Sequence, residues 1–111
     1  MQYQMRLHPE PFNKIKAGTK RIEMRLNDEK RQALKVGDML EFENRADGSR
    51  IMTEITSLDH FKSFNELYAH FDKKDLGYAD NEKANPEDMS IYYSTEDIQK
   101  YGTLAIGVKK I

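Results

Sequence analysis

The chain has 111 residues, of which 33% are charged and 38% are apolar, and it carries a formal net charge of −1 with no cysteine. This length supports one domain with a modest core, and the lack of cysteine excludes disulfides and cysteine-based zinc sites. No apolar run approaches the ~20 residues of a membrane span, and residues 1–4 lack the basic head and apolar core of a signal peptide. We therefore expect a single cytoplasmic domain over residues 1–111, without a cofactor or a metal site.

The charge is unevenly distributed along the chain. Residues 6–35 carry nine Lys or Arg against four Asp or Glu, and the remainder is net acidic. A segregated basic region can attract phosphates even in a nearly neutral chain, because the local field steers association. The alternative is that these side chains are simply solvated. The fold decides between the two by showing whether the cations converge.

Two strands and a helix are expected at the start of the chain. Tyr3, Met5 and Leu7 alternate with polar residues, which predicts a strand over 3–7. A helix is expected over 9–17, because proline is tolerated in a first turn and Gly18 suits a C-cap. A charged strand over 20–26 follows. Its alternation puts Lys20, Ile22 and Met24 on one face and Arg21, Glu23 and Arg25 on the other.

The middle of the chain predicts a short helix and a β-hairpin. Asn27 or Asp28 can cap a helix that continues to Leu34. Strands are expected over 39–43 and from 50 to 55, with an extension toward 61. The Asp47-Gly48 pair between them is a hairpin signal.

The last third of the chain predicts two helices around a polar loop. Ser63 and Glu66 form a capping box, and the helix after them carries Phe64, Leu67, Tyr68 and Phe71 on one face. Residues 72–88 are polar and irregular, as in a loop or flap. Helical spacing over 89–100 is interrupted at 94–97, and a final strand is expected over 103–108.

This order of elements predicts an α+β fold that is mainly β: a small, largely antiparallel barrel flanked by helices. The chain begins and ends on strands. We expect the first and last strands to pair, because closure would remove exposed sheet edges.

One segment, residues 18–25, carries a pattern of functional residue types. It reads Gly-x-Lys-x-x-Glu-x-Arg, met by Gly18, Lys20, Glu23 and Arg25. With the preceding strand and helix, the Val-Gly-Asp turn at 36–38, the Tyr-Tyr-Ser run at 92–94 and the last strand, this pattern resembles the ASCH family of the PUA-like barrel superfamily. The resemblance covers nearly the whole chain. It implies a PUA-like barrel in which the motif lines a cleft for RNA or a nucleotide.

The chemistry of the motif suits such a ligand. On a strand, Glu23 and Arg25 point the same way about 7 Å apart. Arg25 offers a planar fork for a phosphate or a base edge, and Glu23 offers an acceptor or a general base. Lys20 offers a mobile ammonium but points to the opposite face unless the glycine turn rotates it. A structural network in which Glu23 orients Arg25 is compatible with these roles.

We therefore predict an RNA- or nucleotide-binding domain. The expected ligands are single-stranded or modified RNA, or a nucleotide or nucleoside. No membrane partner is expected, and the sequence does not determine the oligomeric state. Tyr92 or Tyr93 would stack on a base, although either could be a packed tyrosine. His8 is a candidate phosphate contact or an ordinary surface histidine. The predicted binding residues are Gly18, Lys20, Arg21, Glu23, Arg25, Tyr92 and Tyr93, with Lys14, Lys16 and Arg31 as further phosphate contacts.

The sequence leaves open whether the chain is an enzyme. Some proteins of the family that it resembles are amidohydrolases that remove the acetyl group of N4-acetylcytidine with a lysine, a threonine and a glutamate. The lysine position falls on Lys20, whereas Glu23 stands where the threonine is expected, a departure from that mechanism. In an enzyme, Lys20 and Glu23 would be catalytic. The candidates for the second acid are Asp80, Glu82 and Glu87. A ribonuclease, and a protein-interaction module built on the acidic stretch 72–97, are further alternatives.

Overall fold

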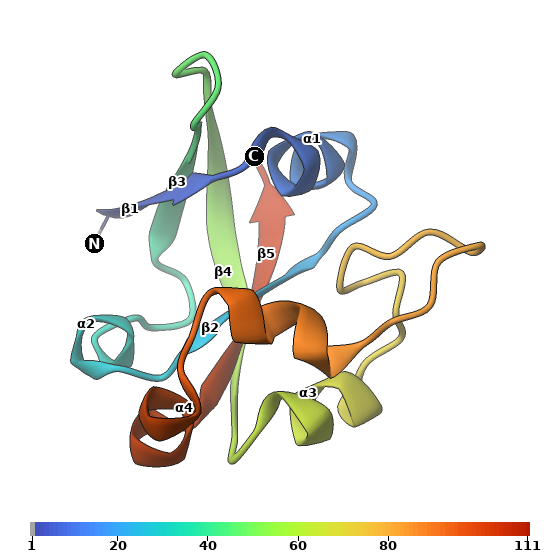
Figure 1. The fold of residues 1–111 in the computed structure, drawn as a ribbon. Coiled ribbons are helices and arrows are strands. Elements are labelled where there is room, and N and C mark those ends of the chain that lie inside the picture. Colours follow the sequence, from blue (N-terminus) through green and yellow to red (C-terminus); the bar gives the residue numbers. More distant parts are fainter. Residues whose placement is uncertain (1) are drawn as a thin grey trace.

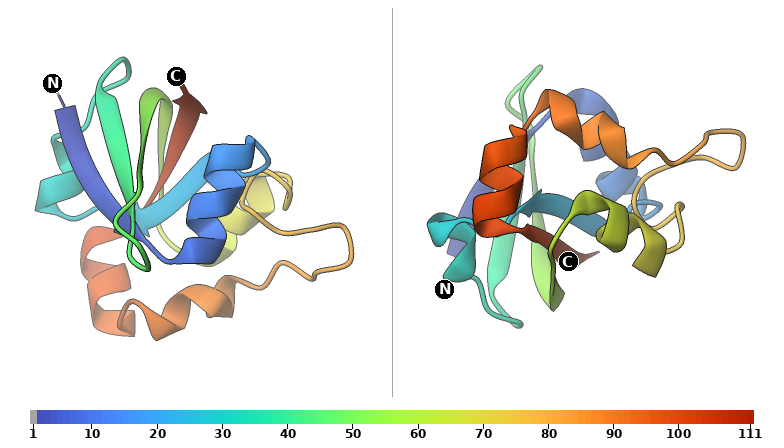
Figure 2. Two further views of the ribbon diagram at one scale, coloured as in Figure 1. Left: turned by 90° about the horizontal axis from the view of Figure 1, so that it is seen from above. Right: turned by 60° about the horizontal axis from the view of Figure 1, so that its bottom comes forward.

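A single five-stranded sheet forms the centre of the computed structural model, which describes residues 2–111; Met1 lies outside the described residues (Figure 1). The strands are ordered β1 (Gln2–Leu7), β3 (Met39–Asn44), β4 (Arg50–Phe61), β5 (Thr103–Lys110) and β2 (Ile22–Leu26). Strand β1 runs parallel to β3, and the other three neighbouring pairs are antiparallel. The sheet curls into a half-barrel with helices around it (Figure 2), so the predicted fold class is confirmed.

Within residues 2–111, four short α-helices and one 3₁₀ helix surround the sheet. They are α1 (Pro9–Ala17), α2 (Glu29–Gln32), α3 (Phe64–His70), the 3₁₀ helix η1 (Pro86–Ile91) and α4 (Thr95–Tyr101). Three predicted caps are confirmed: Gly18 ends α1 with φ of 83°, the Ser63 hydroxyl accepts the Glu66 N–H at 3.2 Å, and of the two candidates before α2 Asp28 accepts the Arg31 N–H at 3.1 Å. Among residues 2–111, no helix has the length and apolarity needed to cross a bilayer.

Two predicted helical segments differ in extent from the structure. Helix α2 is a single turn that ends at Gln32 rather than continuing to Leu34, because the chain then turns Leu34 into the core. The segment expected to be helical from residue 89 begins earlier, as the 3₁₀ helix that Pro86 opens, and Ser94 caps a separate helix after it. The predicted break and recapping are therefore present, but the break lies at residues 92–94, and residues 95–97 already belong to α4.

The expected pairing of the first and last strands is wrong. Strand β5 lies between β4 and β2, while β1 and β2 form the two edges of the sheet. Residues 103–108 of β5 are all buried, since apolar layers cover both faces of this strand. A nearly unbroken apolar run suits a central strand better than an edge. The half-barrel consequently stays open between β1 and β2.

An apolar cluster covers each face of the sheet. The inner cluster fills the half-barrel against α1 and includes Phe12, Leu40, Phe42, Ile55 and Ile106. The outer cluster packs β2 and β5 against α3, η1 and the loop before it. It includes Ile22, Met24, Phe64, Leu67, Leu76 and Met89. Segment 72–88 is therefore anchored by the buried Leu76, although its tip stands away from the body (Figure 2).

Candidate functional site

A cleft of about 670 Å³ runs along the free edge of β2. One wall is formed by the end of β1 and by α1. The other is formed by residues 76–93, which we call the strap. The floor consists of Lys20, Glu23, Met24 and Arg25. This volume lies within the range of small-ligand sites.

The turn after α1 determines how the motif enters the cleft. The N–H groups of Thr19 and Lys20 both bond the Lys14 carbonyl, and those of Arg21 and Ile22 both bond the Asp75 carbonyl. Regular strand geometry starts only at Ile22. Lys20 therefore does not follow the strand alternation: as the stated exception allows, the turn after Gly18 rotates its side chain toward Glu23.

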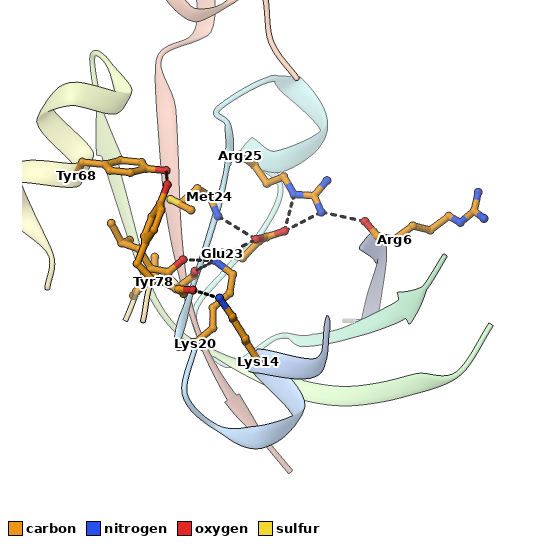
Figure 3. Close-up of polar contacts among 11 residues, drawn as sticks. Arg6, Lys14, Lys20, Glu23, Met24, Arg25, Tyr68 and Tyr78 are labelled. Carbon is orange, nitrogen blue, oxygen red and sulfur yellow. Dashed lines mark hydrogen bonds and ion pairs between the residues drawn. The ribbon is translucent and has the colours of Figure 1, made fainter. Parts of the chain in front are cut away.

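The Glu23 carboxylate lies between two cations (Figure 3). Its Oε2 accepts hydrogen bonds from Nε and Nη2 of Arg25 at 3.0 and 2.8 Å. Its Oε1 lies 3.6 Å from the Lys20 ammonium and accepts the Met24 N–H at 3.2 Å. The structure thus brings three of the predicted site residues into one buried network. Two cations share one carboxylate, so a formal charge of +1 remains.

The Lys20 ammonium is saturated by acceptors. It donates to the carbonyls of Ile22 at 2.5 Å and Leu76 at 2.9 Å, and it pairs with Glu23. Only 4% of its side chain is exposed. Because an ammonium has three donors, none is left for a ligand while the strap is in place.

Burial and charge act in opposite directions on the ionisation of these groups. Burial lowers the pKa of Lys20, and the attraction of Glu23 offsets this only in part. Burial also disfavours the Glu23 carboxylate, but Arg25 and Lys20 outweigh it and hold the pKa of Glu23 below its usual value. The pKa of Arg25 is raised because Glu23 overcomes the cost of burial. Glu23 and Arg25 therefore form a charged pair.

Arg25 also joins the two edges of the sheet. Its Nη2 donates to the carbonyl of Arg6 on β1 at 3.2 Å (Figure 3). Its side chain is 15% exposed, at the floor of the cleft. The open side of the half-barrel is thus spanned by a guanidinium instead of a backbone ladder.

Two lysines hold the strap against the motif. Lys20 binds the Leu76 carbonyl, and Lys14 binds the Gly77 carbonyl at 2.6 Å. The Lys14 ammonium also lies 3.2 Å from Oε1 of Glu10 and 3.5 Å from Oε1 of Glu82. Lys14, predicted as a phosphate contact, is therefore occupied by acceptors of the protein itself.

A hydrogen bond between two tyrosines connects the strap to α3, which carries Tyr68. The hydroxyls of Tyr68 and Tyr78 lie 2.9 Å apart, and Tyr78 donates to Asp88 at 2.7 Å. Burial raises the pKa of both tyrosines. These hydroxyls therefore act as neutral hydrogen-bonding groups at neutral pH.

The two adjacent tyrosines have different positions. Tyr92 is 54% exposed at the cleft mouth, with its ring centroid 6.1 Å from that of His8. Tyr93 lies deeper, stacked on Phe64 at 5.9 Å, and interacts with Arg25. Burial raises the pKa of Tyr93. Tyr92 is thus the accessible stacking surface, and Tyr93 supports the floor.

Several predicted cations lie outside the cleft. Arg21 is exposed beside a separate hollow near Gly18 and Lys109, and Lys16 is exposed on α1. Arg31 pairs with Asp28 at 3.0 Å. Of the proposed second acids, Glu82 and Glu87 line the cleft and Asp80 does not. Among residues 2–111, no three His, Asp or Glu side chains form a group that could hold a metal ion.

Two arginines at the mouth were missed by the sequence interpretation. Arg6 and Arg45 both line the cleft. Arg6 is largely exposed and pairs with Glu43 at 3.1 Å, whereas within the described part of the chain Arg45 makes no ion pair. They meet because the Arg45 N–H bonds the Leu7 carbonyl, next to Arg6. Only the parallel pairing of β1 and β3 brings them together, and no local pattern indicates it.

The comparisons identify both a family and several similar structures. The ASCH domain family matches residues 5–111 of the chain. A crystal structure of the hypothetical protein PH0355 is 30% identical with a TM-score of 0.85, over the whole of both chains. The solution NMR structure of protein PF0455 from Pyrococcus furiosus is 29% identical with a TM-score of 0.73, over 100% of this chain and 98% of that chain.

A more distant structure shares the fold alone. The ASCH domain from Lactobacillus crispatus is 18% identical with a TM-score of 0.63, over 88% of this chain and 68% of that chain. No curated protein matches the chain in sequence.

Proposed function

We propose, from the premise that the chain belongs to the ASCH domain family, that it is an RNA- or nucleotide-binding domain. The ligand would lie in the cleft above Lys20, Glu23 and Arg25. The observation that carries this proposal is a pre-formed cleft of about 670 Å³ with a buried ion-pair floor and an exposed tyrosine at its mouth. A rigid polar floor beneath an aromatic platform suits a planar base with polar edges.

The charges of the cleft define how such a ligand would be held. Five basic and five acidic side chains line it, so the interior is formally balanced apart from His8. Base contacts would therefore dominate inside. Phosphate contacts would come from Arg6 and Arg45 at the mouth. Lys14 and Lys20, both engaged with the strap, would support the site instead of touching phosphate.

The proposal is tested by titrating fluorescent single-stranded RNA at several salt concentrations. With one or two phosphate contacts, a plot of the logarithm of the association constant against the logarithm of the salt concentration should have a slope between about −0.7 and −1.4. Arg45→Gln should weaken binding and make the slope shallower by about 0.7. The matched control is Arg21→Gln, which removes the same charge outside the cleft and should bind like the wild type. Absent binding, or affinity that does not change with salt, would exclude this function.

A hydrolase acting on a modified nucleoside is the second candidate. It is supported by the buried contact of 3.6 Å between Lys20 and Glu23. It ranks second because every donor of Lys20 already has an acceptor. Incubation with N4-acetylcytidine, followed by chromatography for cytidine and acetate, tests it, and a denaturing gel of the titrated RNA tests for a nuclease. Turnover that Lys20→Ala abolishes in a folded protein would reverse the ranking.

A further inference from the structure

A row of aromatic rings leads from the core to the mouth of the cleft. Phe64, which is buried, stacks on Tyr93 at 5.9 Å with an interplanar angle of 17°. Tyr93 lies 6.4 Å from Tyr92, and Tyr92 lies 6.1 Å from His8 with an angle of 37°. The inner rings are fixed by packing. The outer two rings, Tyr92 and His8, are therefore joined to the packed rings through Tyr93 and are exposed to solvent.

The outer two rings have no role in the core. His8 precedes α1 at the N-cap position, yet its side chain makes no capping hydrogen bond. Tyr92 is 54% exposed, and its neighbour Ile91 is 79% exposed. The mouth of the cleft therefore presents an aromatic ring and an adjacent apolar side chain to solvent.

The two rings also come from opposite walls of the cleft. His8 lies at the junction of β1 and α1, and Tyr92 directly follows η1 on the strap side. A planar ring inserted between two others needs about 7 Å, twice the ~3.5 Å contact distance of carbon atoms. The observed 6.1 Å is short of this by about 1 Å. A small opening of the mouth would admit one planar ring.

We propose that His8 and Tyr92 form a two-sided clamp for one unpaired nucleobase. This inference rests on the proposed function and specifies its ligand: a base of a single strand, or a free nucleotide. Each ring of the clamp contacts one face of the base. A base in a duplex already has neighbours on both faces, so the clamp selects against paired RNA.

The experiment uses a short single-stranded RNA that carries one 2-aminopurine, whose fluorescence is quenched by stacking. The same RNA with an abasic site at that position, and the free 2-aminopurine nucleotide, are the comparison ligands. Tyr92→Ala and His8→Ala should each weaken binding about 5- to 100-fold and lose the quenching. Tyr92→Phe and His8→Phe keep a ring and should retain both. His60→Ala, outside the cleft, is the control.

The outcomes separate this inference from the function on which it rests. If the protein quenches the 2-aminopurine in the RNA but not the free 2-aminopurine nucleotide, the ligand is a strand. If it quenches both, free nucleotides are also ligands. Wild-type protein that binds the RNA and its abasic form equally would overturn the clamp while leaving RNA binding in place. Alanine variants that bind and quench like the wild type would also overturn the clamp and leave RNA binding in place. Protein that binds neither RNA nor nucleotide would overturn both proposals.

Discussion

Glu23 is the residue on which the site's geometry depends. It is the counter-ion of both Arg25 and Lys20, and it also accepts the Met24 N–H on the free edge of β2. A buried cation that loses its partner pays the full cost of desolvation. Removing this one carboxylate would therefore leave the buried Lys20 ammonium and the partly buried Arg25 guanidinium without a counter-ion.

Replacing Glu23 should have a large effect on stability. We expect Glu23→Gln to lower the free energy of unfolding by about 3–5 kcal/mol, because the amide keeps the shape but not the charge. Urea denaturation measures this change in the free energy of unfolding. Glu54→Gln, on the exposed face of β4, is the matched control and should change stability by less than about 0.5 kcal/mol. Equal effects of the two substitutions would show that the buried network contributes no special stability.

Comparing the wild type with Glu23→Gln also gives a prediction about how stability depends on pH. The pKa of Glu23 is lower in the folded protein than its ordinary value of 4.5. The stability that it contributes is therefore present above about pH 4.5 and is lost as pH falls through the folded pKa. The difference in unfolding free energy between wild type and Glu23→Gln should shrink over that range. A difference that stays constant between pH 7 and pH 3 would contradict the assigned charge state.

At the level of elements, the strap is anchored in the outer core by Leu76 near its start and by Met89 near its end. The carbonyls of Leu76 and Gly77, and that of Asp75 just before the strap, accept hydrogen bonds from the two lysines and from the turn. No side chain of residues 77–88 is buried, and a segment with so few buried contacts opens more easily than the sheet. The cleft wall that it forms therefore depends on Lys14 and Lys20.

Two lysines of α1 separate this structural role from a simple charge effect. Lys14→Gln and Lys16→Gln remove the same charge from the same helix, but only Lys14 binds the strap, while Lys16 is exposed. We expect amide hydrogen exchange over residues 75–80 to become about 10-fold faster in Lys14→Gln. It should be unchanged in Lys16→Gln. Equal exchange in both variants would mean that Lys14 does not hold the strap.

Local features of the fold were predictable from sequence, and long-range ones were not. The caps at Gly18 and Ser63 depend on residues within one helical turn, so their patterns were sufficient. The orientation of Lys20 depends on the Leu76 carbonyl, 56 residues away, which no local alternation encodes. The cleft likewise depends on the order of strands. The motif residues were predictable, but the arginines at the mouth were not.

At the scale of the whole molecule, the open side of the half-barrel and the cleft are the same feature. An unpaired strand edge normally invites aggregation. On the edge of β2, Lys20 binds the Ile22 carbonyl and Glu23 binds the Met24 N–H, while Arg25 crosses to β1. The motif therefore satisfies two backbone groups of the open edge, the Ile22 carbonyl and the Met24 N–H, and in doing so lines a cleft with fixed charges.

The most direct test of the proposed function is to map the bound RNA onto the protein. We would titrate ¹⁵N-labelled protein with a short single-stranded RNA and follow the amide chemical shifts. We expect the shifts to concentrate at residues 6–14, 20, 23–25, 45 and 76–93, which form the walls, floor and mouth of the cleft. Shifts confined to the outer hollow near Arg21 and Lys109, or no shifts at millimolar RNA, would contradict it.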